Sequence, residues 1–281
     1  MKVLHGKDEI SALCDDWHKE GYSVSIVPTM GFLHEGHLSL IRLAQRHNDK
    51  TVVSIFVNPT QFGPNEDFHS YPRNEKHDLE MCHAEGVDAV FMPSPEEMYC
   101  GDSSVTINEN RISETMCGLS RPGHFSGVLT VVLKLFNITR ADSAVFGMKD
   151  AQQLACIKRM VRDLDVPVKI ISAPTVREAD GLAMSSRNAY LSTEERKNAL
   201  CLYKALIFAE NQYTVGNTSV DPVKKGMKDI ILSVPDVQID YISIVDAATF
   251  IPQEHHLEPN TLIALAVKIG KVRLIDNIIL S

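Results

Sequence analysis

The stretch Pro28–His37, with the sequence Pro-Thr-Met-Gly-Phe-Leu-His-Glu-Gly-His, decides how this chain folds and what it can bind. It follows an apolar, strand-like run at residues 22–27 and leads into a helix-like run at residues 38–47. A glycine-containing turn at this position can hold an anion, because the first N–H groups of a helix lack partners and the helix dipole favours negative charge. The dipole supplies only about 0.3–1 kcal/mol, so side chains must provide most of the discrimination. His34 and His37 offer such side chains, and the turn predicts chemistry on a nucleotide.

Strand-like and helix-like segments continue to alternate through the first two-thirds of the chain. Nearly continuous apolar runs, typical of strands covered on both faces, occur at residues 51–57, 87–92, 143–146 and 166–171. Residues 125–136 carry an apolar stripe at helical spacing. Such alternation implies a parallel sheet with right-handed crossovers, which binds ligands at the carboxyl ends of its strands. We therefore predict a Rossmann-like α/β domain over residues 1–178.

The remainder of the chain has a different pattern. Ser192 and Glu195 have the spacing of a capping box at the start of a helix, and a second helix is expected over residues 221–232. Alternating runs follow, with a hairpin turn around Gly270. These features predict a smaller α+β domain over residues 179–281.

Composition restricts the class of protein. The chain has 281 residues and a formal net charge of −8, which argues against nucleic acid or an anionic membrane as a partner but leaves room for a local phosphate site. No apolar run is long enough to cross a bilayer, and the first residues do not resemble a signal peptide. The six cysteines form no Cys-x-x-Cys pair, which favours free, mostly buried thiols in a reducing cytoplasm.

The His34–His37 pair allows several interpretations. Two histidines near a turn can be purely structural. A zinc site would need a third ligand and favours i, i+4 spacing on one helix face, and neither is evident, so no metal ligand is predicted. Between a strand and a helix, the pair suits phosphate contact and stabilisation of transition-state charge, and either imidazole could donate or relay a proton.

Two further segments offer polar groups near strand or helix ends. Asn58 and Gln61 directly follow the strand-like run at residues 51–57 and could bind the hydroxyls and carboxylate of a small substrate. An Asx-type turn that only completes the loop is the alternative. Arg121 and His124 precede the helical stripe and could face an anion, but a helix start with a solvated arginine is equally compatible.

Two more segments suit a nucleotide. Gly147 permits close backbone approach, Lys149 offers a point charge for phosphate, and Asp150 could accept from ribose hydroxyls, although glycine before a helix is common. Gln153 would lie one turn into the following helix, on the side of Asp150. Residues 184–187 combine two hydroxyls with a guanidinium, as in a mobile phosphate clamp or a polar interdomain loop.

The motifs PTMGFLHEGH, VSIFVNPTQFG, YPRN, RPGHFSGV, VFGMKDAQQL and GLAMSSRNAYL occur in this order between about residues 22 and 195. In this combination the chain closely resembles the pantothenate synthetase, or pantoate–β-alanine ligase, family. The resemblance implies an ATP- and Mg²⁺-dependent homodimeric ligase of coenzyme A biosynthesis. It would condense pantoate with β-alanine through a pantoyl adenylate and release AMP and pyrophosphate.

The resemblance also implies roles for individual residues. The ATP site would comprise Met30, Gly31, Phe32, Leu33, His34, Glu35, Gly36, His37, Gly147, Met148, Lys149, Asp150, Val176, Met184, Ser185, Ser186 and Arg187. Gln61 and Gln153 would bind pantoate, with Gln61 also near β-alanine and Asn58 as a possible helper. His37 would be the proton donor, with His34 and Lys149 as further catalytic groups. The smaller domain would close over the nucleotide.

Other functions remain compatible with parts of the sequence. A nucleotidyltransferase with the same H-x-G-H motif would keep the nucleotide on its product, whereas the ligase would release AMP. A non-catalytic nucleotide-binding protein would release no pyrophosphate. A metal hydrolase built on His34 and His37 would hold a stoichiometric zinc ion. The paired glutamines and the segment 184–187 favour the ligase.

Overall fold

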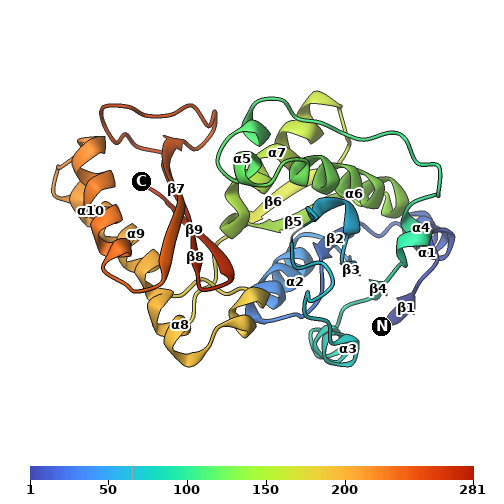
Figure 1. Cartoon of the computed structure of the whole chain (residues 1–281). Coiled ribbons are helices and arrows are strands. Elements are labelled where there is room, and N and C mark those ends of the chain that lie inside the picture. Colours follow the sequence, from blue (N-terminus) through green and yellow to red (C-terminus); the bar gives the residue numbers. More distant parts are fainter. Residues whose placement is uncertain (65) are drawn as a thin grey trace. The chain divides into compact units, whose positions relative to one another are not determined.

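The structure is a computed structural model that describes residues 1–64 and 66–281, and the chain divides into two compact units (Figure 1). The first unit comprises residues 1–148 and 152–174, and the second comprises residues 149–151 and 175–281. The sequence placed the boundary slightly later, after residue 178. The segment before that point belongs to the second unit because Arg177 pairs with Asp276, at 2.6 Å between Nη1 and Oδ2.

The first unit is built on a six-stranded parallel sheet with the order β1-β4-β3-β2-β5-β6. Its strands are β1 (Lys2–Leu4), β2 (Val24–Thr29), β3 (Lys50–Ile55), β4 (Ala89–Phe91), β5 (Ser143–Gly147) and β6 (Lys169–Ala173). The Rossmann-like parallel sheet expected from the sequence is confirmed. Strand β1 could not be predicted from the sequence, because its three residues, Lys-Val-Leu, do not belong to a longer apolar run.

Helices flank this sheet. They are α1 (Lys7–Lys19), α2 (Glu35–His47), α3 (Glu75–Ala84), α4 (Pro95–Met98), α5 (Cys117–Ser120), α6 (His124–Thr139) and α7 (Ala151–Asp163), with the 3₁₀ helices η1 (Pro59–Gln61), η2 (Ile112–Glu114) and η3 (Met148–Asp150). Ile41 of α2 and Cys82 of α3 pack with Val27 and Val53 in one apolar cluster. Helices α1 and α6 pack against each other and against β2. Strands β2 and β3 are therefore buried, as their continuous apolar sequences predict.

The register of β2 and β3 positions the loops that follow them. Thr29, the last residue of β2, pairs with Ile55, the last residue of β3. Because the two strands are parallel and end together, the loops after them leave the same edge of the sheet side by side. The first loop leads into α2, and the second contains η1.

The second unit combines an antiparallel sheet with helices. Its strands are β7 (Val237–Asp246), β8 (Thr261–Ile269) and β9 (Val272–Ile279), and its helices are η4 (Ser186–Tyr190), α8 (Thr193–Asn198), α9 (Leu200–Thr214) and α10 (Val220–Leu232). The predicted capping box is present, since Ser192 Oγ accepts from the Glu195 N–H and the Glu195 carboxylate accepts from the Ser192 N–H. The predicted hairpin is also present, with Ile269 paired to Val272 around Gly270. The α+β prediction is thus confirmed.

The cysteines are free thiols, and all but Cys100 are buried. Burial raises the pKa of Cys14 and of Cys82 to about 12, and that of Cys201 to about 11. This pattern confirms the prediction of mostly buried thiols. No helix in residues 1–64 or 66–281 has the length and apolar character needed to cross a membrane.

Candidate active site

The turn after β2 brings His34 and His37 together at the start of α2. His34 immediately precedes the helix and His37 lies in its first turn, with ring centroids 4.1 Å apart. The His34 backbone N–H donates to His37 Nδ1 at 3.3 Å. In a neutral His37 ring the proton therefore sits on Nε2, which leaves that nitrogen as a donor. Two imidazoles thus lie beside the helix N-terminus, the arrangement expected of a phosphate site.

The backbone between β2 and His34 adopts an unusual conformation. Gly31 has a φ of 81° and Phe32 a φ of 51°, both in the left-handed region. Asp78 of α3 accepts hydrogen bonds from the backbone N–H groups of Phe32 and Leu33. Its Oδ2 lies 2.9 Å from Phe32 N, and its Oδ1 lies 2.7 Å from Leu33 N. Asp78 could not be predicted from the sequence, because no local pattern links it to a loop 45 residues earlier.

Asn58 and Gln61 lie in the neighbouring loop, after β3. Asn58 is buried, and its Nδ2 donates to Gln61 Oε1 at 3.1 Å and to the Gly127 carbonyl at 3.2 Å. Its Oδ1 accepts from the Thr60 N–H, so the Asx-type turn is also present. The Gln61 Nε2 lies 3.2 Å from Met30 Sδ, which brings these two predicted site residues together. Asn58 thus orients Gln61.

Arg121 and His124 hold the backbone of Gln61. His124 Nδ1 lies 2.9 Å and Arg121 Nη2 lies 3.3 Å from the Gln61 carbonyl oxygen. Arg121 also pairs with Glu66, with two N···O distances of 2.6 Å. Burial alone would raise the pKa of Glu66, but the hydrogen bonds and charge of Arg121 outweigh it and hold that pKa below its usual range. The alternative of a solvated arginine is therefore wrong, and the anion that Arg121 faces in the structure is the Glu66 carboxylate.

Lys149 and Asp150 lie in η3, directly after β5, within the short segment that belongs to the second unit. The Lys149 carbonyl accepts a hydrogen bond from Asn277 Nδ2 of β9 at 2.8 Å. The Asn277 backbone N–H in turn donates to Asp276 Oδ1, at 2.8 Å, and Asp276 is the buried partner of Arg177. Strand β9 therefore fixes the backbone that carries Lys149. Asn277 was not found from the sequence, since 128 residues separate it from Lys149.

The two adjacent glutamines of α7 have different surroundings. Gln152 is buried, and its side chain accepts from the Cys117 N–H and donates to the carbonyls of Ile112 and Thr115. Gln153, the residue expected to bind pantoate, is partly exposed in the first turn of the helix. The structure is therefore compatible with a substrate-binding role for Gln153 and gives Gln152 a structural one.

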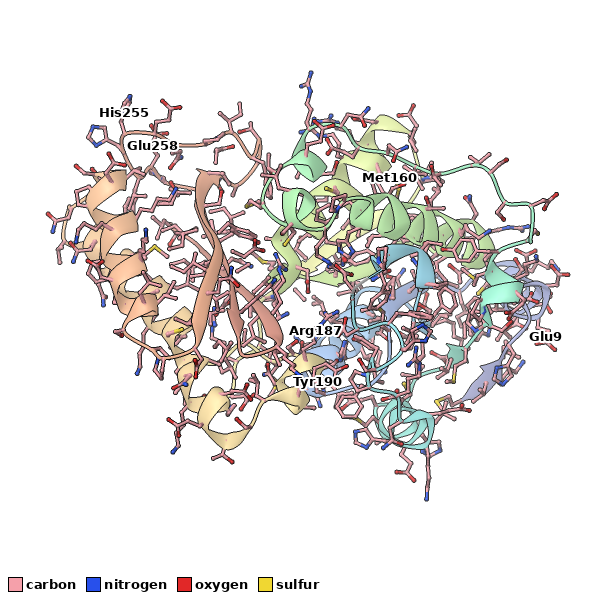
Figure 2. All side chains as sticks on the ribbon, in the orientation of Figure 1. Glu9, Met160, Arg187, Tyr190, His255 and Glu258 are labelled. Carbon is pink, nitrogen blue, oxygen red and sulfur yellow. The ribbon has the colours of Figure 1, made fainter. Side chains whose placement is uncertain are left out.

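The remaining predicted nucleotide contacts come together within the second unit. The Val176 carbonyl accepts from the Met184 N–H at 3.0 Å, so a turn of chain joins these two residues. Ser185 caps η4 by accepting from the Arg187 N–H at 3.3 Å. Ser186 is buried in η4, and Arg187 lies on the same short helix (Figure 2).

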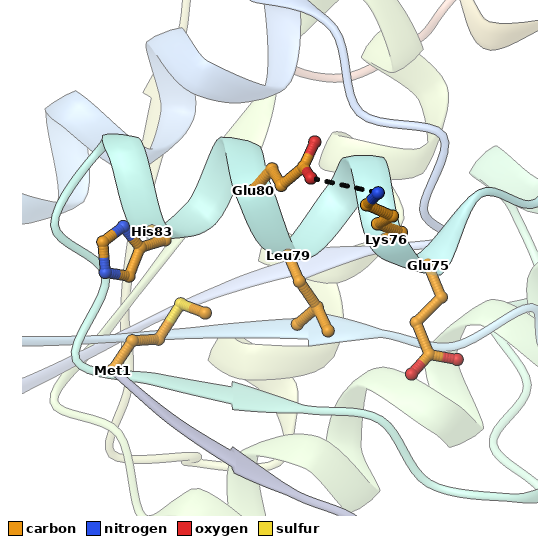
Figure 3. A pocket seen from close by; sticks show the side chains of 6 residues that line it. All are labelled: Met1, Glu75, Lys76, Leu79, Glu80 and His83. Atoms are coloured by element: carbon orange, nitrogen blue, oxygen red, sulfur yellow. Dashed lines mark ion pairs between the residues drawn. The ribbon is translucent and has the colours of Figure 1, made fainter.

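A cavity near Met1 does not include any of the predicted site residues. It has a volume of about 670 Å³ and is lined by Met1, Glu75, Lys76, Leu79, Glu80 and His83, none of which was predicted for the site (Figure 3). Lys76 and Glu80, two exposed residues of α3, form an ion pair there with 4.0 Å between Nζ and Oε1. Within the part of the chain that the structure describes, no group of three or more His, Cys, Asp or Glu residues could hold a metal ion.

Comparison with known proteins identifies the family. The family model described as pantoate-beta-alanine ligase matches residues 2–279. The chain belongs to this family. Pantothenate synthetase from Caldicellulosiruptor saccharolyticus is 55% identical over 281 residues, covering 100% of both chains. The synthetase from Caldicellulosiruptor bescii is 53% identical over 281 residues, covering 100% of this chain and 99% of the relative.

Solved structures agree with this assignment. A pantothenate synthetase from Thermus thermophilus is 42% identical, covers 99% of each chain and superposes with a TM-score of 0.94. A pantoate-beta-alanine ligase from Francisella tularensis, solved in complex with beta-gamma ATP and beta-alanine, is 36% identical with a TM-score of 0.83. It covers 99% of this chain and 97% of its own. The Rossmann-like unit with a smaller second unit is therefore the architecture of a known ligase family.

Proposed function

We propose that this protein is an ATP-dependent ligase that joins pantoate to β-alanine, giving pantothenate, AMP and pyrophosphate. Family membership supports this function, as does the ligand-bound Francisella relative. The structural observation that carries the proposal is the contact between Gln61 Nε2 and Met30 Sδ at 3.2 Å. It joins the loop that carries the two histidines to the loop predicted to bind the acid, as transfer between ATP and a carboxylate requires.

The first half-reaction activates the acid. A pantoate carboxylate oxygen attacks the α-phosphorus of ATP, the bond from that phosphorus to the bridging oxygen breaks, and pyrophosphate leaves. Gln61 and Gln153 orient pantoate, while His34, His37 and the first turn of α2 bind phosphate oxygens. The Lys149 ammonium adds positive charge where negative charge develops. Fixed donors of this kind are worth about 3–4 kcal/mol each when removed singly.

The second half-reaction forms the amide. The β-alanine amine attacks the acyl carbon, the bond from that carbon to the phosphate oxygen breaks, and AMP leaves while the amine loses a proton. Residues 176 and 184–187 of the second unit contact the nucleotide in this proposal. The closure of the smaller domain over the nucleotide stays a prediction, which an ATP-dependent change in the distance between two attached labels would test.

We propose that magnesium enters with ATP. Mg²⁺ keeps several waters and binds mainly to substrate phosphates in enzymes of this kind. The donor set fits such a role, since Asp150 supplies one partly exposed carboxylate in η3, beside Lys149. When bound, the ion would neutralise phosphate charge.

The test is a pyrophosphate-release assay with ATP and magnesium. We expect release that depends on pantoate, and sustained turnover to free AMP only when β-alanine is also present. The His37→Ala variant should keep its fold, judged by circular dichroism, and lose most turnover. ATP binding without pantoate-dependent release would refute the ligase, and a stable nucleotidyl product would indicate a transferase.

We also propose a cytoplasmic homodimer that supplies coenzyme A biosynthesis. The compartment is supported by the free thiols, five of them buried, which suit a reducing environment. The dimer is supported by the family resemblance. Cell fractionation and light scattering on the purified protein test the two statements separately.

A further inference from the structure

We propose that Asp78 is a positioning residue for ATP, which shapes the loop from Met30 to Leu33 without touching the nucleotide. The inference rests on the proposed ATP-dependent function. Asp78 lies on α3, outside every motif considered for the site, and its side chain reaches the loop that carries the histidines. Its role follows from three features of its surroundings.

First, its carboxylate is fully engaged by the loop backbone. Oδ2 accepts from the Phe32 N–H at 2.9 Å, and Oδ1 accepts from the Leu33 N–H at 2.7 Å. Two adjacent N–H groups directed at the two oxygens of one carboxylate fix the position and the orientation of their peptide planes. A carboxylate accepts such bonds more strongly than a neutral group.

Second, the loop packs so closely against this carboxylate that its residue types are restricted. A Cβ added at Gly31 would lie 2.9 Å from Asp78 Oδ2 and 3.0 Å from Ile55 Cγ2, so only glycine fits there without displacement. Phe32 keeps a φ of 51°, a conformation that costs a non-glycine residue about 1–3 kcal/mol and persists only where its surroundings impose it. The two hydrogen bonds to Asp78 supply that constraint.

Third, burying a carboxylate costs free energy unless hydrogen bonds or opposite charges compensate for the lost water. Asp78 is 1% exposed, and among the described residues no lysine or arginine forms an ion pair with it. Burial raises its pKa, while the two backbone hydrogen bonds act in the opposite direction. A negative charge facing ATP would also repel phosphate. Because both oxygens accept from the loop, the carboxylate instead shapes the backbone that leads into His34.

The experiment compares Asp78→Asn with wild-type enzyme. An asparagine offers one acceptor oxygen, and its amide group would face the other N–H, so one of the two hydrogen bonds is lost. A displacement of about 1 Å near the reacting groups costs about 10²-fold in rate. We expect kcat/KM for ATP to fall by about 10²-fold and ATP affinity, measured by calorimetry, to weaken, with KM for β-alanine unchanged.

The matched control is Asp142→Asn. Asp142 Oδ2 also accepts a backbone N–H, from Val24 at 2.7 Å, but at the opposite end of β2. Asparagine can still accept that N–H but removes the charge that faces His18 Nε2 at 3.1 Å, so this variant should lose some stability and keep its ATP parameters. A purely structural role for Asp78 would likewise lower the thermal midpoint and the active fraction but leave KM and Kd for ATP unchanged, which would overturn the inference.

A measurement on wild-type protein covers the case in which Asp78→Asn does not fold. Hydrogen exchange should show slow amides at Phe32 and Leu33, and their NMR signals should shift when ATP is added. Fast exchange at either amide, or signals insensitive to bound ATP, would refute the positioning role. Wild-type protein that binds no ATP at all would instead refute the proposed function.

Discussion

Replacing Gly127 by alanine tests how helix α6 positions the loop that we propose to bind pantoate. Gly127 lies in α6 against the backbone of η1, where a Cβ would come within 2.4 Å of the Thr60 carbonyl oxygen and 2.7 Å of Gln61 N. Ordinary contact begins at 3.4 Å, so the loop backbone must move by about 1 Å. Gln61 would move with it, because its own backbone is the obstacle.

The magnitude separates stability from activity. Overpacking costs about 1–3 kcal/mol, and the better helix propensity of alanine returns about 1 kcal/mol, so the free energy of unfolding should fall by no more than about 2 kcal/mol. For a chain of this size that is a few degrees in Tm. A displacement of about 1 Å in Gln61, by contrast, should lower kcat/KM for pantoate by about 10²-fold.

The assay is pantoate-dependent pyrophosphate release, with thermal unfolding measured on the same preparations. Gly226→Ala in α10 is the control, because its Cβ would meet the Phe208 ring at 2.4 Å, a similar overlap in a helix of the second unit. It should lower Tm without changing KM for pantoate. A folded Gly127→Ala enzyme with wild-type kcat/KM for pantoate would refute the proposed link between α6 and Gln61.

Three further outcomes are expected. A thiol reagent at neutral pH should modify Cys100 rapidly and the other cysteines slowly, and Cys100→Ser should abolish the fast phase; mass spectrometry of the adducts checks this. Arg121 holds the folded-state pKa of Glu66 below its ordinary value of 4.5. The decrease in the free energy of unfolding caused by Glu66→Gln should therefore be largest above pH 4.5 and become smaller as the pH falls through the folded-state pKa. Denaturant unfolding at several pH values checks this. Asn277→Ala should lower kcat by about tenfold, because the Lys149 carbonyl loses its hydrogen bond from Asn277. Asn277→Asp should not restore kcat, because a carboxylate cannot donate that hydrogen bond. An unchanged kcat in steady-state assays would contradict the role of β9.

Patterns that are local in the chain predicted most of the fold. The turn at residues 28–37, the buried strands and the capping box at Ser192 each depend on residues within a few positions of one another, and each appears in the structure. Helix α1 did not stand out, because only Ile10 and Cys14 are buried along its length and its N-cap is Gly6. A helix with so narrow a buried face gives little periodic signal.

The same distinction between local and distant patterns applies to the candidate site. Motifs at strand ends predicted residues such as His37 and Gln61 for the site, since a parallel sheet gathers those ends at one edge. The groups that fix them were missed: Asp78 reaches back 45 residues to Leu33, and Asn277 reaches back 128 residues to Lys149. A buried aspartate and a buried asparagine have no distinctive sequence context, and only the fold reveals which backbone they hold.

Substitutions of these two kinds of residue should act differently. Removing a group proposed to contact substrate, such as His37, should change the reaction directly and costs the fold the hydrogen bond from the His34 N–H to Nδ1 at 3.3 Å. Replacing Asp78 by asparagine should change the loop that leads into these groups, and it also removes the acceptor of one of the Phe32 and Leu33 N–H groups, which costs about 1–3 kcal/mol where that group is buried. Positioning residues should therefore couple stability to ATP affinity, whereas the histidines should separate the two. Measuring both quantities on His37→Ala and Asp78→Asn distinguishes the classes, and a His37→Ala enzyme that loses as much stability as Asp78→Asn would contradict it.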